Sequence, residues 1–173
     1  MKIAVDAMGG DFAPKEIVAG AILAAKRYDC EIVLVGDQTQ IQKELDKNYP
    51  EWRKSTISIH HASDVVGMGE HPGVAVRRKK DSSIVVATRL VKEGKCDAVL
   101  SAGNTGAAAA SALFILGRIK GIDRPSIATP IPTGKGSVTL LLDSGANVDC
   151  KPKHLCQMYA RIRKSSCRFI KYW

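Results

Sequence analysis

The feature of this sequence that most constrains its fold is a regular alternation of short apolar runs with helical patterns. Strands are predicted over residues 2–5, 31–35, 56–59 and 98–100, and helices between them over residues 16–27, 39–47 and 82–93. Strands separated by helices of this length are typical of a parallel sheet covered by helices on both faces. The sequence therefore predicts an α/β fold of three layers with a mostly parallel, Rossmann-like sheet.

Beyond residue 100 the chain continues with an alanine-rich helix, predicted over residues 105–116. Two further strands are predicted over residues 126–130 and 137–143. The Gly-Lys-Gly-Ser stretch between them, residues 134–137, lacks the upstream glycine of a P-loop. We therefore expect this stretch to form a hairpin-like connection.

The net charge of +9 would suggest a nucleic-acid partner if it were spread over the whole chain. Instead, residues 151–173 hold seven basic side chains and no acidic one, while the preceding residues hold 19 basic and 17 acidic side chains. We therefore expect no nucleic-acid partner. Binding through the tail alone stays open as an alternative, and it would be steeply salt-dependent.

The five cysteines form no CxxC pair and are odd in number, so they indicate neither a zinc site nor a disulfide framework. We expect no metal and no cofactor. The first residues lead directly into a predicted strand rather than a signal peptide, and the longest apolar run, residues 107–117, is too short to span a bilayer. These features predict a cytoplasmic location.

The first glycine-rich turn, residues 6–11, directly follows the first predicted strand and contains Gly9 and Gly10. Consecutive glycines let the backbone approach an anion closely, and the helix that follows offers free N–H groups. The acidic side chains of Asp6 and Asp11 would repel a bare phosphate, so they are better suited to orienting donors, holding a cation or positioning the backbone. A tight strand-to-helix turn with an aspartate cap remains the alternative.

The second glycine-rich turn, residues 101–106, begins with Ser101 at the end of a predicted strand. Gly103 permits an unusual backbone angle, and either Asn104 or Thr105 can cap the following helix. Small side chains leave room for a ligand while the polar ones supply neutral donors, which suits a phosphate or an oxyanion. The alternative is a well-capped turn with no ligand.

A third loop, residues 143–149, also follows a predicted strand and carries Asp143, Asn147 and Asp149. Because the carboxyl ends of parallel strands meet at one edge of a sheet, we expect all three loops to converge there. Four successive basic residues at 77–80 precede a predicted helix. This run could meet phosphates or an acidic protein, or it could form an ordinary solvated face.

Five sequence blocks, in this order, resemble bacterial acyl-ACP:phosphate acyltransferases of phospholipid synthesis. The blocks are DAMGGD at 6–11, EHP at 70–72, RRKKDSS at 77–83, SAGNTGA at 101–107 and GANVD at 145–149. The resemblance implies transfer of a fatty acyl group from acyl carrier protein to inorganic phosphate. It also implies a homodimer and a fold similar to phosphotransacetylases and isocitrate-type dehydrogenases.

The resemblance also suggests roles for single residues. Asn104, Lys79 and Lys80 are expected to be catalytic, with one of the two lysines supplying positive charge. The expected substrate-binding residues are Asp6, Gly9, Gly10, Asp11, Ser101, Gly103, Thr105, Asn147 and Asp149. Acyl carrier protein is acidic, so the basic run 77–80 is also a candidate for its docking surface.

The resemblance covers residues 1–155, and the family's chains are about twice as long as this one. We interpret residues 1–155 as the N-terminal α/β portion of the acyltransferase domain, and the fold as incomplete. Residues 156–173 form a divergent basic tail without clear helical periodicity, as a truncation or frameshift would leave. The absent half would hold further strands, much of the dimer surface and the helices by which the full-length family associates peripherally with membranes. A non-catalytic fragment that binds phosphate or acyl phosphate is the alternative function.

Overall fold

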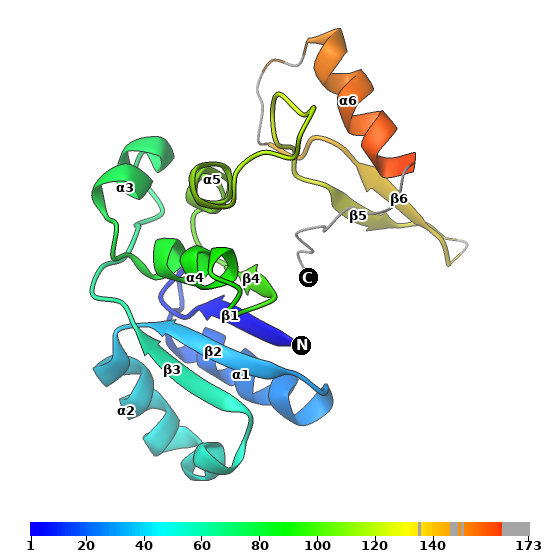
Figure 1. The fold of residues 1–173 in the computed structure, drawn as a ribbon. Coiled ribbons are helices and arrows are strands. Elements are labelled where there is room, and N and C mark those ends of the chain that lie inside the picture. The colour runs from blue at the N-terminus through cyan, green and yellow to red at the C-terminus, as the bar shows by residue number, and fades with distance from the viewer. Residues whose placement is uncertain (135, 146–148, 150, 164–173) are drawn as a thin grey trace. The chain divides into compact units, whose positions relative to one another are not determined.

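A parallel sheet of four strands forms the centre of the N-terminal part of the chain in this computed structural model (Figure 1). The structure describes residues 1–134, 136–145, 149 and 151–163, with backbone alone for 158–163. The chain divides into two compact units, Met1–Leu116 and Gly117–Trp173, and each is described by itself. This division was not predicted from the sequence.

The four strands are β1 (Lys2–Asp6), β2 (Glu31–Gly36), β3 (Ile57–His61) and β4 (Ala98–Leu100). Their order across the sheet is β3-β2-β1-β4, and every pair is parallel. The four predicted strands are thus confirmed within one or two residues at each end. They consist mostly of isoleucine, valine and leucine, as expected where a parallel sheet is buried on both faces.

Helices cover both faces of this sheet, which confirms the predicted three-layer architecture. Helices α1 (Lys15–Arg27) and α2 (Gln38–Asn48) pack on one face, and α4 (Ser83–Lys92) packs on the other (Figure 1). Successive strand residues alternate between the layers, so Val5 packs with α1 and α2 whereas Ala4 packs with α4. Gly94, with a φ of +71°, follows the end of α4.

Two helical features on the α4 side differ from expectation. Helix α3 (Pro72–Arg78) occupies a stretch for which no helix was predicted, because its seven residues make only about two turns, fewer than the periodicity needs to be recognised. Pro72 starts it with a backbone angle suited to the first helical position, and Ala75 and Val76 are buried. The predicted helix 105–116 is α5 (Thr105–Ser111) followed by a π-helical turn, η2 (Ala112–Leu116).

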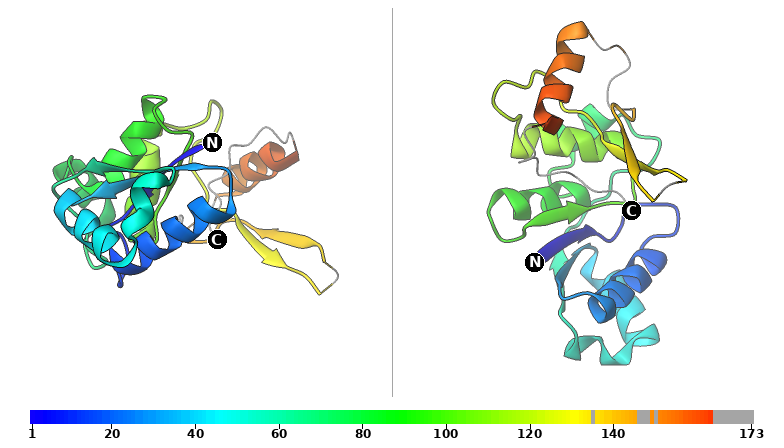
Figure 2. Two further views of the ribbon diagram at one scale, coloured as in Figure 1. Left: turned by 90° about the horizontal axis from the view of Figure 1, so that it is seen from below. Right: turned by 90° about the vertical axis from the view of Figure 1, so that its right-hand side faces the viewer.

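The second unit contains a two-stranded antiparallel hairpin and one helix. Strands β5 (Thr129–Pro132) and β6 (Val138–Leu141) pair with each other, and Figure 2 shows them as two yellow arrows. The hairpin connection expected around residues 134–137 is confirmed. Helix α6 (Pro152–Arg163) extends into the region expected to lack helical periodicity. A short 3₁₀ helix, η1 (Pro50–Lys54), completes the elements described.

In the described parts of both units, no helix is long and apolar enough to cross a membrane.

Candidate functional site

The two glycine-rich turns lie next to each other because of the strand order. The chain runs from β1 outward through β2 to β3, and then crosses back to place β4 on the other side of β1. The carboxyl ends of β1 and β4 therefore flank the point at which the strand order reverses. In open α/β sheets, ligands bind in the crevice at that point.

The backbones of the two turns are in direct contact. A Cβ atom added at Gly103 would lie 2.9 Å from the Cα of Gly9, and one added at Gly10 would lie 3.1 Å from the carbonyl oxygen of Ala102. Gly10 also has a φ of +115°, which strongly favours glycine. These glycines are thus required for the close approach of the turns.

A hydrogen-bonded chain joins the side chains of the two turns. The Ser101 hydroxyl donates to Asp6 Oδ2 over 2.7 Å, and the Gly103 amide donates to Ser101 Oγ over 3.1 Å. A Cβ atom at Gly9 would overlap Asp6 Oδ2, so the carboxylate lies against the first turn as well. Of the roles left open for Asp6, orienting hydrogen-bond donors matches this arrangement.

The Asp6 carboxyl is buried, with 3% of its surface exposed. Burial raises its pKa above the ordinary value, and this effect outweighs neutral polar groups that lower it: the Ser83 and Ser101 hydroxyls and the Met8 and Gly9 amides. Asp6 Oδ1 and Ser83 Oγ are both buried, and neither has a hydrogen-bond partner among the described residues. The Ser83 hydroxyl lies close enough to Asp6 to lower the pKa of its carboxyl group.

The Asn104 side chain is fully engaged by the protein. Its Oδ1 caps α5 by accepting from the Ala107 amide over 3.0 Å. Its Nδ2 group lies within 3.1 to 3.2 Å of three carbonyl oxygens, those of Gly67, Met68 and Glu70. Asn104 thus holds the segment before α3 against the second turn, and in this conformation its side chain positions the loop.

Lys79 is also engaged, with its ammonium group held by the same segment. Its Nζ donates to Glu70 Oε1 over 2.8 Å and to the Val65 carbonyl over 2.7 Å, and Asp64 Oδ1 lies 3.5 Å away. The hydrogen bond from Lys79 lowers the pKa of Glu70, and the same bond raises the pKa of Lys79. Two carboxylates thus already balance the charge of Lys79.

The other members of the basic run are exposed. Arg77, Arg78 and Lys80 form no ion pair with the described residues. The Arg77 guanidinium lies over the Phe114 ring, 4.7 Å from its centroid, a distance typical of a cation–π contact. These three residues, rather than Lys79, present unbalanced positive charge.

The remaining predicted site residues divide between the two units. Asp11 and Thr105 are exposed in the first and second turns, respectively. Asn147 lies outside the described residues, and Asp149 is exposed in the second unit. The structure thus brings together Asp6, Gly9, Gly10, Ser101 and Gly103, and leaves the convergence of the third loop as a prediction.

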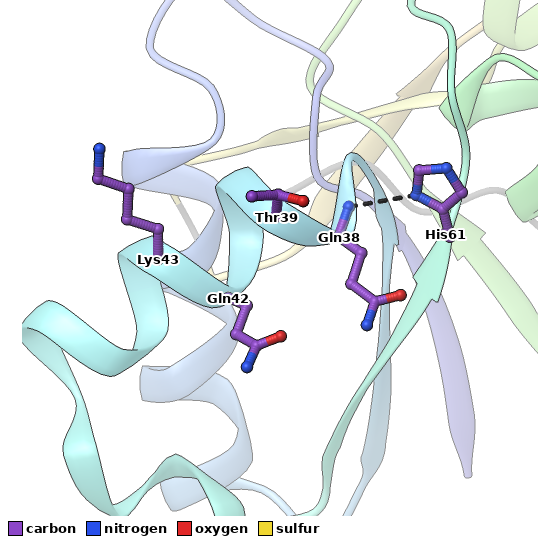
Figure 3. A pocket seen from close by; sticks show the side chains of 5 residues that line it. All are labelled: Gln38, Thr39, Gln42, Lys43 and His61. Atoms are coloured by element: carbon purple, nitrogen blue, oxygen red, sulfur yellow. Dashed lines mark hydrogen bonds between the residues drawn. The ribbon is translucent and has the colours of Figure 1, made fainter.

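A separate shallow hollow of about 330 Å³ lies where β3 ends and α2 begins (Figure 3). The Gln38 amide donates to His61 Nδ1 there over 3.3 Å. The residues lining it are Gln38, Thr39, Gln42, Lys43 and His61. None of them belongs to either glycine-rich turn, so the candidate site rests on the geometry of the turns.

Within the described residues, no cluster of histidine, cysteine or acidic side chains could hold a metal ion.

Two residues important to this geometry were missed by the analysis of the sequence. Ser83 was noted only in a predicted helix and a sequence block, although α4 brings it beside Asp6. Glu70 was noted only in a sequence block, although it binds Lys79 and the Gly67 amide. The contact of Ser83 with Asp6 joins distant parts of the chain, and Glu70 meets Lys79 only because α3 folds between them, so no local pattern signals either contact.

Comparison with known proteins identifies the family of this chain. Residues 1–165 match the family described as "Fatty acid synthesis protein", so the match runs past residue 155. A protein named "Phosphate acyltransferase" from Desulforamulus reducens is 64% identical over 157 residues, covering 91% of this chain and 46% of that protein.

Two other proteins with the same name agree. The one from Pelotomaculum thermopropionicum is 60% identical over 157 residues. The aligned region covers 91% of this chain and 45% of that protein. The one from Syntrophomonas wolfei is 54% identical over 171 residues, covering 98% of this chain and 52% of its own. The chain thus spans about half the length of the curated relatives it matches. With most of its residues matched, it belongs to the fatty acid synthesis protein family.

Proposed function

We propose that this chain carries the phosphate-binding part of an acyltransferase that moves a fatty acyl group from acyl carrier protein to inorganic phosphate. The observation that carries the proposal is the contact between the Gly9 and Gly103 turns at the carboxyl ends of β1 and β4. Gly9, Gly10 and Gly103 carry no side chain that would cover the backbone of the turns, which suits the close approach of an anion to amide groups. The name shared by the relatives supports the same chemistry.

Such a reaction needs no nucleophilic side chain, because phosphate is the nucleophile. An oxygen of hydrogen phosphate attacks the thioester carbonyl carbon and the C–S bond breaks. The leaving thiolate takes up the proton that the phosphate loses. The protein has to hold phosphate beside the thioester and stabilise the negative charge that develops on the carbonyl oxygen. The Gly10 and Thr105 backbones are the proposed contacts, and Ser101 and Asn104 hold the turns in place.

The positive charge that phosphate and the carrier protein require would come from Lys80 together with Arg77 and Arg78. These side chains are exposed and not balanced by described carboxylates, whereas Lys79 is tied to Glu70. Lys79 would become available only if phosphate displaced Glu70. A homodimer, a cytoplasmic location and peripheral contact with membranes in the full-length protein belong to the same proposal.

The test is acyl phosphate formation by the full chain, supplied with acyl carrier protein bearing a fatty acyl thioester and with labelled phosphate. We expect labelled acyl phosphate, and a loss of at least about tenfold for Gly103→Ala, since a Cβ there displaces the first turn. Gly20→Ala, on the open surface of α1, is the matched control. Equal turnover by both variants would overturn the assignment of the turns.

The second candidate function is a fragment that binds phosphate without catalysis. It is favoured by the fact that the chain spans about half of its relatives, because the absent half could supply groups needed for turnover. Phosphate binding by calorimetry, without labelled product in the assay above, would identify it.

A further inference from the structure

Asp6 is the one buried carboxyl group among the described residues. It lies at the carboxyl end of β1, between the two glycine-rich turns. Burying a charged carboxylate is costly unless a cation or several hydrogen bonds compensate for the lost solvation. The groups that surround Asp6 therefore decide which protonation state it adopts.

The surroundings of Asp6 are neutral on every side. Val35 pairs with it on β2, Ser101 approaches from the end of β4, and Ser83 approaches from the start of α4. No salt bridge within the described residues includes Asp6, and no charged group from β2, β4 or α4 faces it. Asp11, the other acidic residue of the first turn, is exposed.

The two carboxyl oxygens of Asp6 are used unequally. Oδ2 accepts a hydrogen bond from the Ser101 hydroxyl, whereas Oδ1 is buried with no partner among the described residues. A proton on Oδ1 would remove the uncompensated charge and leave the bond to Ser101 intact. Desolvation raises the pKa of Asp6 and acts in the same direction, against the Ser83 and Ser101 hydroxyls and the Met8 and Gly9 amides, which lower it.

We propose that Asp6 is a positioning residue that carries a proton on Oδ1 at neutral pH, linking the two turns as an uncharged carboxyl so that a dianion can bind beside it. This inference rests on the proposed phosphate site. An ionised Asp6 would place a like charge within a few ångströms of the phosphate, in surroundings where screening is weak. Asp6, whose negative charge would repel an anion at the first turn, would then be uncharged.

The protonation state can be measured without any ligand. In the full chain labelled with carbon-13 at aspartate carboxyl groups, we expect the Asp6 signal, assigned by its loss in Asp6→Asn, to be that of a neutral carboxyl at neutral pH. The Asp29 signal, from an exposed residue at the amino ends of the strands, is the reference in the same spectra. An ionised Asp6 at neutral pH would overturn the proposal.

The electrostatic role of Asp6 is measured with sulfate, a phosphate-like dianion whose charge does not change at or above neutral pH. We expect wild-type affinity for sulfate to fall about tenfold or more as pH rises through the Asp6 titration. The Asp6→Asn variant, which resembles the neutral carboxyl, should keep its affinity across the same range. The Asp29→Asn control should follow the wild type.

The outcomes separate this inference from the proposed function. Sulfate affinity that falls equally in wild type and Asp6→Asn would overturn the electrostatic role of Asp6. Absence of both sulfate and phosphate binding in every variant would overturn the proposed function in this chain. In that case the carbon-13 titration would still decide the protonation state of Asp6.

Discussion

The Ser101 hydroxyl donates a hydrogen bond to Asp6 Oδ2 over 2.7 Å, joining residues that are 95 positions apart in the sequence. Because the Gly103 amide donates in turn to Ser101 Oγ, the hydroxyl proton of Ser101 is directed at Asp6. Ser101 was expected to offer a donor to a ligand. In this conformation it instead connects the ends of β1 and β4, which fixes the separation of the two turns.

The first prediction concerns the pH dependence of folding. A carboxyl whose folded-state pKa is raised holds a proton that the unfolded chain has released, so its contribution to stability is lost as pH rises through the raised value. Asp6→Asn does not titrate. Its stability relative to wild type should therefore increase with pH, by about 1.4 kcal/mol for each unit of pKa elevation. Urea unfolding from acid to neutral pH measures the difference, with Asp29→Asn, at an exposed aspartate, as the matched control.

The second prediction concerns the contact between the turns. Gly9→Ala would place a methyl group against Asp6 Oδ2 and 3.0 Å from Ser101 Oγ, so we expect a loss of about 1–3 kcal/mol. Gly20→Ala lies in α1 with open space around it and should stabilise by about 0.5–1 kcal/mol. Chemical denaturation of both variants provides the measurement. A tolerated Gly9→Ala would mean that the turns are not in close contact.

The third prediction separates the two uses of Asn104. Asn104→Ser keeps an oxygen that can cap α5 but removes the Nδ2 donor to the Gly67, Met68 and Glu70 carbonyls. Asn104→Ala removes both, so it should cost about 1 kcal/mol more than Asn104→Ser. Hydrogen exchange should speed up over residues 67–70 in both variants. Unchanged exchange there would contradict the role of Asn104 in holding this segment.

The fourth prediction concerns the ion pair between Glu70 and Lys79. The lowered pKa of Glu70 means that its contribution to stability is present above its ordinary pKa and is lost as pH falls through the lowered value. Glu70→Gln should therefore be less stable than wild type at neutral pH, with the difference vanishing in acid. Both side chains are partly exposed, so the effect should be small and should weaken with salt. Lys80→Met is the control and should match the wild type.

The fifth prediction concerns the carrier protein. If Arg78 and Lys80 meet an acidic partner, Arg78→Glu should raise the KM for acyl carrier protein and reduce the salt dependence of turnover. Lys43→Glu, on α2, applies the same charge change away from the basic run. Equal effects from the two variants in a steady-state assay would indicate a response to net charge rather than docking.

The sequence by itself determined the architecture of the first unit. The apolar runs of β1 and β2 and the amphipathic pattern of α1 each reflect local periodicity, which a parallel sheet with helices on both faces requires. The glycine-rich turns after β1 and β4 were identifiable for the same reason, because glycine pairs and capping residues are local signals. Helix α3 was missed because about two helical turns are too few for the apolar periodicity to be recognised.

The tertiary structure decided how these parts act together. Only the crossover that returns from β3 to β4 brings Ser101 to Asp6, and only the packing of α4 brings Ser83 beside it. The charge of Lys79 looked available in the sequence, yet Glu70, on the other side of α3, binds it. Local patterns specify strands and turns because they depend on near neighbours. The partner and the protonation state of a buried group depend on segments far apart in the sequence, so they are settled only when the chain has folded.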